Sequence, residues 1–158
     1  MLRRVMRLPA SDRQLLFRLV PIVAAIRAAL WVAPLDRIQR RLARHHRPWL
    51  MPTTFLQSFA PSRLAWAVVV VSHRVPDASC LTQALALQFL LARSGRSSRL
   101  HIGVAHSETK RFQSHAWVEC DGQVLIDRPS DVRRYRAIVS WESSPDGCTL
   151  LPGSGFAG

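Results

Sequence analysis

Cysteine is scarce in this chain of 158 residues, which contains only Cys80, Cys120 and Cys148. An odd number of cysteines without a short paired spacing argues against a disulfide framework and against a four-ligand zinc site. The N-terminus also lacks the small-residue cleavage site of a signal peptide. We therefore expect a cytoplasmic protein with reduced thiols, and we expect neither a metal ion nor another cofactor.

Long uninterrupted apolar runs are also missing. The stretch 19–33 is broken by Pro21 and Arg27, and the stretch 64–71 is far shorter than the ~20 residues that a membrane span requires. No transmembrane helix is predicted.

Lysine is nearly absent, since Lys110 is the only one among 22 basic residues, and the net charge is +12. Eleven of the arginines fall within the first fifty residues. This basic segment fits a solvated helical face, a nucleic-acid or membrane surface, or a dock for an acidic partner. It has no nucleic-acid-binding motif and no interleaved aromatic residues, so no nucleic-acid partner is expected. Its apolar residues recur at helical spacing, which favours packing faces and leaves room for a peripheral membrane contact.

The pattern of apolar residues changes along the chain from helical spacing to strand alternation. Helices are predicted at 11–31, 35–46 and 62–75, with a proline-rich connection at 47–61. Ser11 or Asp12 is expected to cap the first helix. The valine run in the third helix fits a strand equally well by periodicity. We expect a basic helical region at 1–61, a core at 62–150 and a flexible tail at 151–158.

Cys80 opens the run CLTQALALQFLLARSG, which predicts a buried helix that ends near Gly95. If Ser79 or Asp77 caps this helix, the Cys80 thiol lies among unpaired backbone N–H groups that favour an anion. A helix N-terminus and a neighbouring imidazole lower the pKa of a cysteine thiol, and the thiolate is the nucleophile. Without such an imidazole, a small buried hydrophobic residue is the commoner explanation of a free cysteine.

After this helix, alternating residues predict antiparallel strands at 99–105, 112–120 and 123–127. A buried helix followed by such a sheet is an α+β arrangement. The second strand carries His115, and the third ends at Asp127. This order of cysteine, histidine and aspartate is that of papain- or transglutaminase-type cysteine enzymes.

The turn between the second and third strands decides whether His115 and Asp127 can meet. A two-residue turn at 121–122 would place the two side chains on opposite faces of the sheet. A three-residue loop at 120–122 with a bulge would place them directly opposite each other. We therefore predict the bulged turn, or an equivalent bulge nearby, as a condition of a triad with Cys80.

The other histidines and cysteines are not expected to take part in chemistry. His101 and His106 have no carboxylate or thiol at ligand spacing, so a metal site is not predicted. Cys120 lies in the expected turn and Cys148 in the glycine-containing end of the chain, so both are taken as non-catalytic.

The segments SRLAWAV, VPDASCLTQALALQFLLARSG, LHIGV and FQSHAWVECDG, roughly residues 62–128, resemble the leader peptidases of lasso peptide biosynthesis, a transglutaminase-like cysteine protease family. The resemblance implies a papain- or transglutaminase-like core in which the cysteine helix packs on a small antiparallel sheet. It also implies that Cys80 is the nucleophile, His115 the general base and then acid, and Asp127 the residue that orients the imidazole. The glutamine that papain-like enzymes place upstream of the cysteine is missing here.

The function implied by this resemblance is removal of the leader from a ribosomally made lasso precursor peptide through a thioester. A separate ATP-dependent cyclase would then use the freed amine. No strand-rich segment precedes residue 62, so we expect a separate leader-recognition protein, for which Arg40, Arg41 and Arg44 offer a docking surface. Two alternatives remain: acyl transfer of the transglutaminase or arylamine acetyltransferase type, and a non-enzymatic basic helical adaptor.

Overall fold

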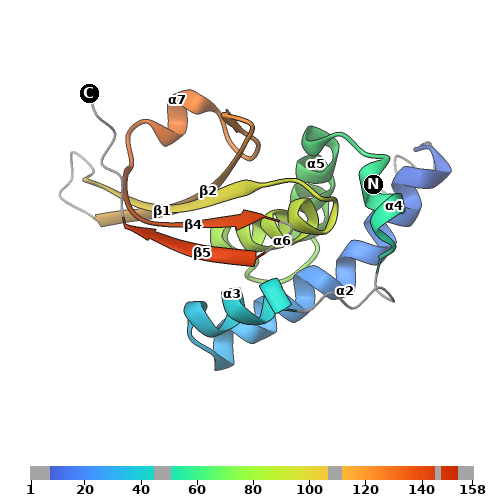
Figure 1. Ribbon diagram of the computed structural model, residues 1–158, viewed down its shortest axis with the longest axis horizontal. Helices are drawn as coiled ribbons and strands as arrows, with labels where there is room; N and C mark the ends of the chain where they lie inside the picture. Colours follow the sequence, from blue (N-terminus) through green and yellow to red (C-terminus); the bar gives the residue numbers. More distant parts are fainter. Residues whose placement is uncertain (1–7, 45–50, 107–111, 145–146, 153–158) are drawn as a thin grey trace.

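The computed structural model describes residues 8–44, 51–106, 112–144 and 147–152. Helices form the first half of the chain and an antiparallel sheet most of the second, which confirms the predicted α+β class (Figure 1). The helices are α2 (Ala10–Val32), α3 (Leu35–Arg44), α4 (Thr53–Gln57), α5 (Pro61–Ser72), α6 (Cys80–Arg93) and α7 (Pro129–Val132). The strands are β1 (Ser98–His106), β2 (Phe112–Cys120), β3 (Gln123–Val124), β4 (Arg136–Ser144) and β5 (Gly147–Pro152).

The two N-terminal helices lie close to their predicted positions, but the first begins differently. Neither Ser11 nor Asp12 caps α2, which follows Pro9 directly. The Asp12 carboxylate is buried and forms an ion pair with Arg63 of α5. The carboxylate therefore connects α2 to α5 instead of accepting hydrogen bonds from the backbone N–H groups at the start of α2. Positions 45–46 of the second predicted helix lie outside the described residues.

The structure around α5 shows whether the valine run is a helix or a strand, and it shows that the connection before it contains a short helix. The valine run is helical, and Pro61 starts the helix, where its fixed φ is favourable and its missing N–H is harmless. The proline-rich connection at 47–61 is not wholly irregular, because α4 forms within it after Pro52.

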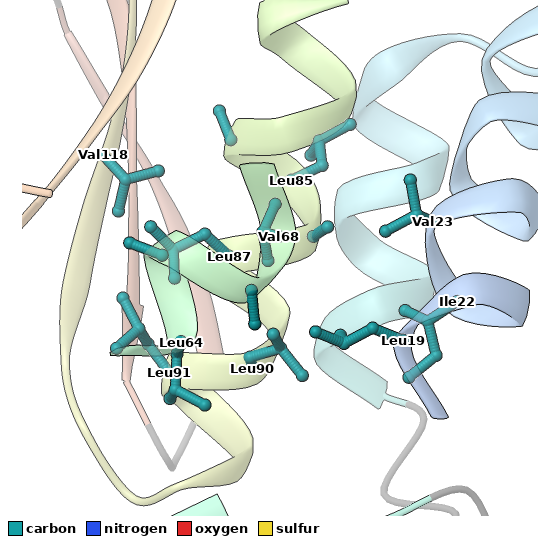
Figure 2. Packing of buried hydrophobic residues seen from close by; sticks show 14 of the residues in the cluster. Leu19, Ile22, Val23, Leu64, Val68, Leu85, Leu87, Leu90, Leu91 and Val118 are labelled. Atoms are coloured by element: carbon teal, nitrogen blue, oxygen red, sulfur yellow. The ribbon is translucent and has the colours of Figure 1, made fainter. Parts of the chain in front are cut away.

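One hydrophobic core joins α2, α5 and α6 to one face of the sheet (Figure 2). Its central element is α6, which is apolar on nearly every side and therefore has to be enclosed by other elements. Full burial of one such apolar side chain stabilises the fold by about 1.5–3 kcal/mol. The members drawn around α6 come from α2 (Leu19, Ile22, Val23), α5 (Leu64, Val68), α6 itself (Leu85, Leu87, Leu90, Leu91) and β2 (Val118).

The sheet has the order β3-β2-β1-β4-β5, and every neighbouring pair is antiparallel. Alternate residues of each strand point to opposite faces. In β2, Ala116 and Val118 join the core with α6, whereas Trp117 joins a second, smaller cluster with Val132 and Tyr135 in and after α7. The sheet thus has two packed faces, and α7 stands on the side away from α2 and α3 (Figure 1).

The length and apolar composition of α2 would by themselves allow this helix to cross a membrane. It continues through Pro21 and Arg27, the residues on which the prediction of no membrane span rested. One face of α2 is nevertheless part of the protein core, where Leu15, Leu19 and Val23 are fully buried.

Gly103 of β1 provides a test of the packing on the second face. A Cβ atom added there would lie 2.9 Å from two atoms of the Trp117 ring and 2.9 Å from the carbonyl oxygen of Arg136. Overpacking of this kind lowers the free energy of unfolding by about 1–3 kcal/mol. We expect Gly103→Ala to lower the urea midpoint accordingly.

The matched control is Gly122→Asn, at a position where an added Cβ would meet no atom within 4 Å. Asparagine tolerates the left-handed backbone of Gly122 better than most side chains, so we expect this variant to lower the urea midpoint less than Gly103→Ala does. Equal midpoints for both variants would contradict the close contact between Gly103 and Trp117.

Candidate active site

Cys80 is the first residue of α6 and is partly exposed. Of the two residues expected as caps, Ser79 occupies the N-cap position, but its hydroxyl lies 3.4 Å from Thr82 Oγ1 and makes no capping bond to the backbone. The first bond of the helix joins the Gln83 N–H to the Ser79 carbonyl at 3.1 Å. The N–H groups of residues 80–82 therefore have no acceptor within the helix, and the positive end of the helix dipole lies at the thiol.

The loop before Cys80 is connected to α2. Asp77 has a left-handed backbone with φ 56°, and its carboxylate lies 3.9 Å from the Arg27 guanidinium. Because the Asp77 side chain is exposed, this ion pair adds little stability. Its contribution is positional, since it links the start of the cysteine helix to the first helix of the chain.

His115 and Asp127 are brought together, as predicted for two members of a triad. The His115 Nε2 and Asp127 Oδ2 atoms lie 2.8 Å apart, and both side chains are partly exposed. An ionised carboxylate only accepts hydrogen bonds, so Nε2 is the protonated nitrogen and Nδ1 carries the lone pair. Within the described residues Nδ1 has no hydrogen-bond partner, which leaves it available as a base.

The predicted bulged turn before Asp127 is wrong. Cys120 pairs with Gln123, so Asp121 and Gly122 form a two-residue turn, both with the positive φ that an Asp-Gly type I′ turn adopts. The predicted strand 123–127 is also too long, because β3 ends at Val124. A regular continuation would have placed Asp127 on the opposite face from His115.

The carboxylate reaches the imidazole because the chain leaves the strand before Asp127. A single further backbone bond, from the Leu125 N–H to the Val118 carbonyl at 3.0 Å, follows the last ladder pair. The backbone then bends, and Asp127 takes a left-handed conformation with φ 77°. This bend after the strand brings the Asp127 carboxylate to the same face of the sheet as His115, which is the effect expected of the predicted bulge.

The His115 ring lies in a row of stacked rings on the second face of the sheet. Its centroid is 5.0 Å from that of Tyr135 and 6.4 Å from that of Trp117, and the planes of His115 and Trp117 differ by 14°. On the far side of Trp117 lies His101, with centroids 5.1 Å apart. Because Trp117 is fully buried, the packing around it limits how far the His115 ring can tilt.

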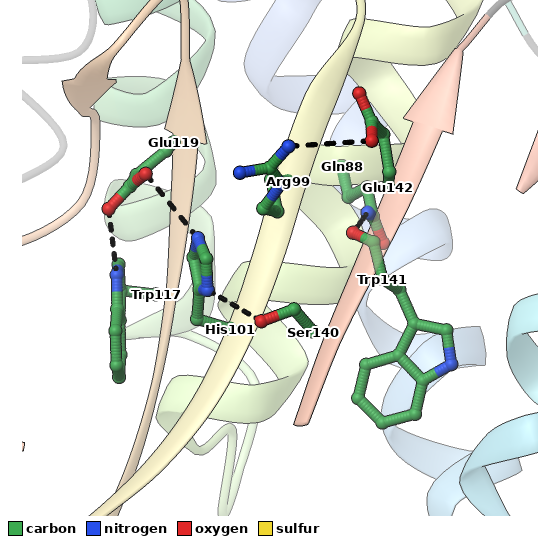
Figure 3. A network of polar contacts seen from close by, with 8 residues as sticks. All are labelled: Gln88, Arg99, His101, Trp117, Glu119, Ser140, Trp141 and Glu142. Atoms are coloured by element: carbon green, nitrogen blue, oxygen red, sulfur yellow. Dashed lines mark hydrogen bonds and ion pairs between the residues drawn. The ribbon is translucent and has the colours of Figure 1, made fainter. Parts of the chain in front are cut away.

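Polar contacts hold Trp117 and His101 in place (Figure 3). The Trp117 indole N–H donates to Glu119 Oε1 at 3.3 Å, and the other carboxylate oxygen lies 3.4 Å from His101 Nε2. His101 Nδ1 lies 2.8 Å from the Ser140 hydroxyl. Sequence patterns pointed to none of these supporting residues, although the alternation 115, 117, 119 in one strand already puts two of them on the same face as His115.

Cys80 and His115 are not joined by a hydrogen bond in the described part of the chain. Helix α6 packs against the face of β2 that carries Ala116, whereas His115 belongs to the other face. Within the described residues, the edge of β2 has no paired strand beside His115, because β3 pairs only with Glu119 and Cys120. This edge offers a path from the thiol to the imidazole.

The second described cysteine has a different environment. Cys120 is buried, and its thiol donates to the Ser97 carbonyl at 3.4 Å. Burial, and to a lesser degree the Asp121 carboxylate, raise the pKa of Cys120, which keeps the thiol protonated and unreactive. The side chains of Cys148 and His106 lie outside the described residues. Across the described ranges, no three His, Cys, Asp or Glu side chains gather into a potential metal site.

Burial also lowers the pKa of His101, even though the carboxylate of Glu119 acts in the opposite direction. The folded chain therefore keeps this ring neutral at pH values where the unfolded chain binds a proton, below about pH 6.5. We expect the free energy of unfolding to fall as the pH drops through this range, by at most about 1.4 kcal/mol per pH unit from His101.

Urea unfolding of wild type and His101→Gln at a series of pH values measures this contribution, which should disappear in the variant. His73→Gln, at an exposed histidine, is the matched control and should keep the wild-type slope. Equal slopes in wild type and His101→Gln would contradict the prediction.

Comparison with known proteins agrees with this geometry. A family model described as the transglutaminase-like superfamily matches residues 22–140, which is well over half of the chain. No curated protein and no solved structure matches the chain. The matched segment includes the cysteine at the helix start, the histidine of β2 and the aspartate beside it, and the chain thus belongs to the transglutaminase-like superfamily.

Proposed function

We propose that this protein is a cysteine peptidase that removes the leader from a ribosomally made lasso precursor peptide. The observation that carries the proposal is the His115–Asp127 hydrogen bond, which leaves Nδ1 without a partner among the described residues, in a domain whose Cys80 starts a buried helix. A transglutaminase-like domain fits a cysteine peptidase or an acyl transferase in general. The choice of a lasso leader as substrate rests on the sequence resemblance around Cys80 and HAWVE.

The proposed reaction begins when His115 Nδ1 takes the proton of the Cys80 thiol. The thiolate attacks the scissile carbonyl, and the Cys80 N–H at the start of α6 donates to the oxyanion that forms. The C–N bond then breaks, and the amine of the core peptide leaves with the proton from His115. Water, deprotonated by His115, hydrolyses the thioester and releases the leader carboxylate and the free thiol.

Asp127 keeps the proton on Nε2 throughout this sequence and stabilises the imidazolium that forms twice. The missing hydrogen bond between Cys80 and His115 is compatible with this role, because catalytic hydrogen bonds are often long without substrate and shorten when it binds.

Two further proteins belong to the proposal. A separate leader-recognition protein would deliver the precursor, and an ATP-dependent cyclase would close the ring on the released amine. We place the dock for the recognition protein, or for an acidic leader, on α3. There Arg37 and Arg41 are exposed, and Arg40 is held by an ion pair with Asp36 one turn earlier.

Acyl transfer is the second candidate, because the same three residues would serve it and the family match fits either reaction. An amine rather than water would then resolve the thioester. Analysis of the product separates the two: a free carboxylate on the leader indicates a peptidase, and a new amide indicates a transferase.

Cleavage of a candidate precursor in the presence of a recognition protein, followed by mass spectrometry, tests the triad. We expect Cys80→Ala to abolish cleavage, and Asp127→Ala to lower kcat/KM by roughly 10²–10⁴-fold because the imidazole loses its orientation. Cys120→Ala is the matched control and should retain the activity.

A non-enzymatic adaptor predicts a different result. Iodoacetamide would then label Cys80 no faster in wild type than in His115→Ala, and Cys80→Ala would leave maturation of the precursor unchanged. Either result would refute the peptidase.

Charge reversal of Arg40, Arg41 and Arg44 together tests the proposed dock. Since the dock is electrostatic, we expect partner binding and cleavage to weaken by about tenfold or more, and the loss to shrink at high salt. Reversal of Arg133, Arg134 and Arg136, which lie near α7 and in β4, is the matched control. Unchanged binding in the α3 variant would refute this surface.

A further inference from the structure

The side of α2 that faces away from the core is apolar from Phe17 to Val32. We call the residues concerned the outer face of α2: Phe17, Val20, Pro21, Ala24, Ala28, Trp31 and Val32, all of them exposed. Their spacing of three, four and seven residues places them on one side of the helix. The exposed fractions are 74% for Phe17, 43% for Val20, 69% for Trp31 and 85% for Val32. Four of the five large hydrophobic residues that are exposed in the described part of the chain thus lie on one helix.

The charges beside this face are mostly positive, and the exposed Asp77 carboxylate, 3.9 Å from the Arg27 guanidinium, is the exception. Arg18 and Arg27 lie on its two flanks, and the sequence from 13 to 35 contains no acidic residue. The Arg27 guanidinium lies over the Trp31 ring at 4.9 Å from its centroid. The nearest exposed carboxylate in sequence, Asp36 of α3, is paired with Arg40. An apolar stripe with arginine on both flanks is complementary to a lipid surface with anionic headgroups.

Burial on the inner side of α2 determines how such a contact can form. Leu15, Leu19 and Val23 are fully buried against the rest of the core, so the helix cannot leave the domain to span a bilayer without exposing them. The outer face can still enter the boundary between headgroups and acyl chains while the helix lies parallel to the membrane. Trp31 and Arg27 suit this depth, because tryptophan and arginine place apolar and polar groups side by side.

A second copy of the chain fits this face less well than lipid does. A two-fold contact would bring the same patch of both copies together, and with it the Arg18 and Arg27 side chains of each. The net charge of +12 on each copy would add to the repulsion.

We propose that the outer face of α2 binds the surface of an anionic lipid bilayer, so that the protein works as a peripheral membrane protein. This interaction is separate from the proposed catalysis, and it uses neither Cys80 nor the His115–Asp127 pair.

Flotation of the full chain with lipid vesicles tests the proposal. We expect binding to vesicles of phosphatidylglycerol and phosphatidylcholine in equal parts, weak binding to pure phosphatidylcholine, and a loss of binding as salt is added. Phe17→Ser and Trp31→Ser should each weaken binding to the mixed vesicles by about tenfold, with an unchanged melting temperature because both residues are exposed. Ile138→Ser, which removes an exposed apolar residue from β4, is the matched control and should bind like the wild type.

Quenching by brominated lipids then locates the contact on the protein. We expect Trp31 emission to be quenched in the mixed vesicles, and Trp31→Phe to keep binding while it loses this component. Absence of binding to the mixed vesicles would overturn the proposal, as would binding that survives both serine substitutions. Self-association, or binding of an acidic protein, that depends on Phe17 and Trp31 while vesicles are ignored would assign the face to a protein partner and would equally overturn it.

Discussion

The enclosure of α6 is the constraint on which the rest of the structure depends. This helix has no polar side, so it needs α2 and α5 on one flank and the sheet on the other. Helix and sheet are thereby held in one rigid arrangement. The first residue of α6 lies at the edge of the core. Cys80 is therefore partly exposed, and the neighbouring backbone N–H groups have no acceptor within the helix.

The second constraint is the separation of the two faces of the sheet. The face toward α6 supplies stability, whereas the face toward α7 carries His115 and the rings that pack against it. Trp117 contributes both to stability and to the candidate active site, because it fills the space above Gly103 and also packs against His115. The polar contacts of Glu119, His101 and Ser140 hold Trp117 in place and thereby support both the packing of this face and the position of His115.

Much of this arrangement could be predicted from local patterns. The largely apolar composition of the run from Cys80 predicted α6 and its first residue, and the alternation of apolar and polar residues predicted β1 and β2 with His115. The bend of the backbone after β3, between Leu125 and Asp127, could not be predicted in the same way. Asp-Gly strongly favours the two-residue turn, and only the bend after Leu125 returns the carboxylate to the right face. Such a bend depends on tertiary contacts rather than on a repeating spacing. The row of rings around His115 also joins three distant segments, which no local pattern connects.

The left-handed backbone of Asp127 restricts which residues can occupy this position. Most side chains with a Cβ atom are strained at φ 77°, and glycine, which is not, carries no group that could hold an imidazole. Aspartate and asparagine are the two residues that tolerate this backbone and also place an oxygen within reach of the ring. The fold itself therefore narrows the choice of partner for His115 to two amino acids, and of these only aspartate brings the negative charge that stabilises an imidazolium.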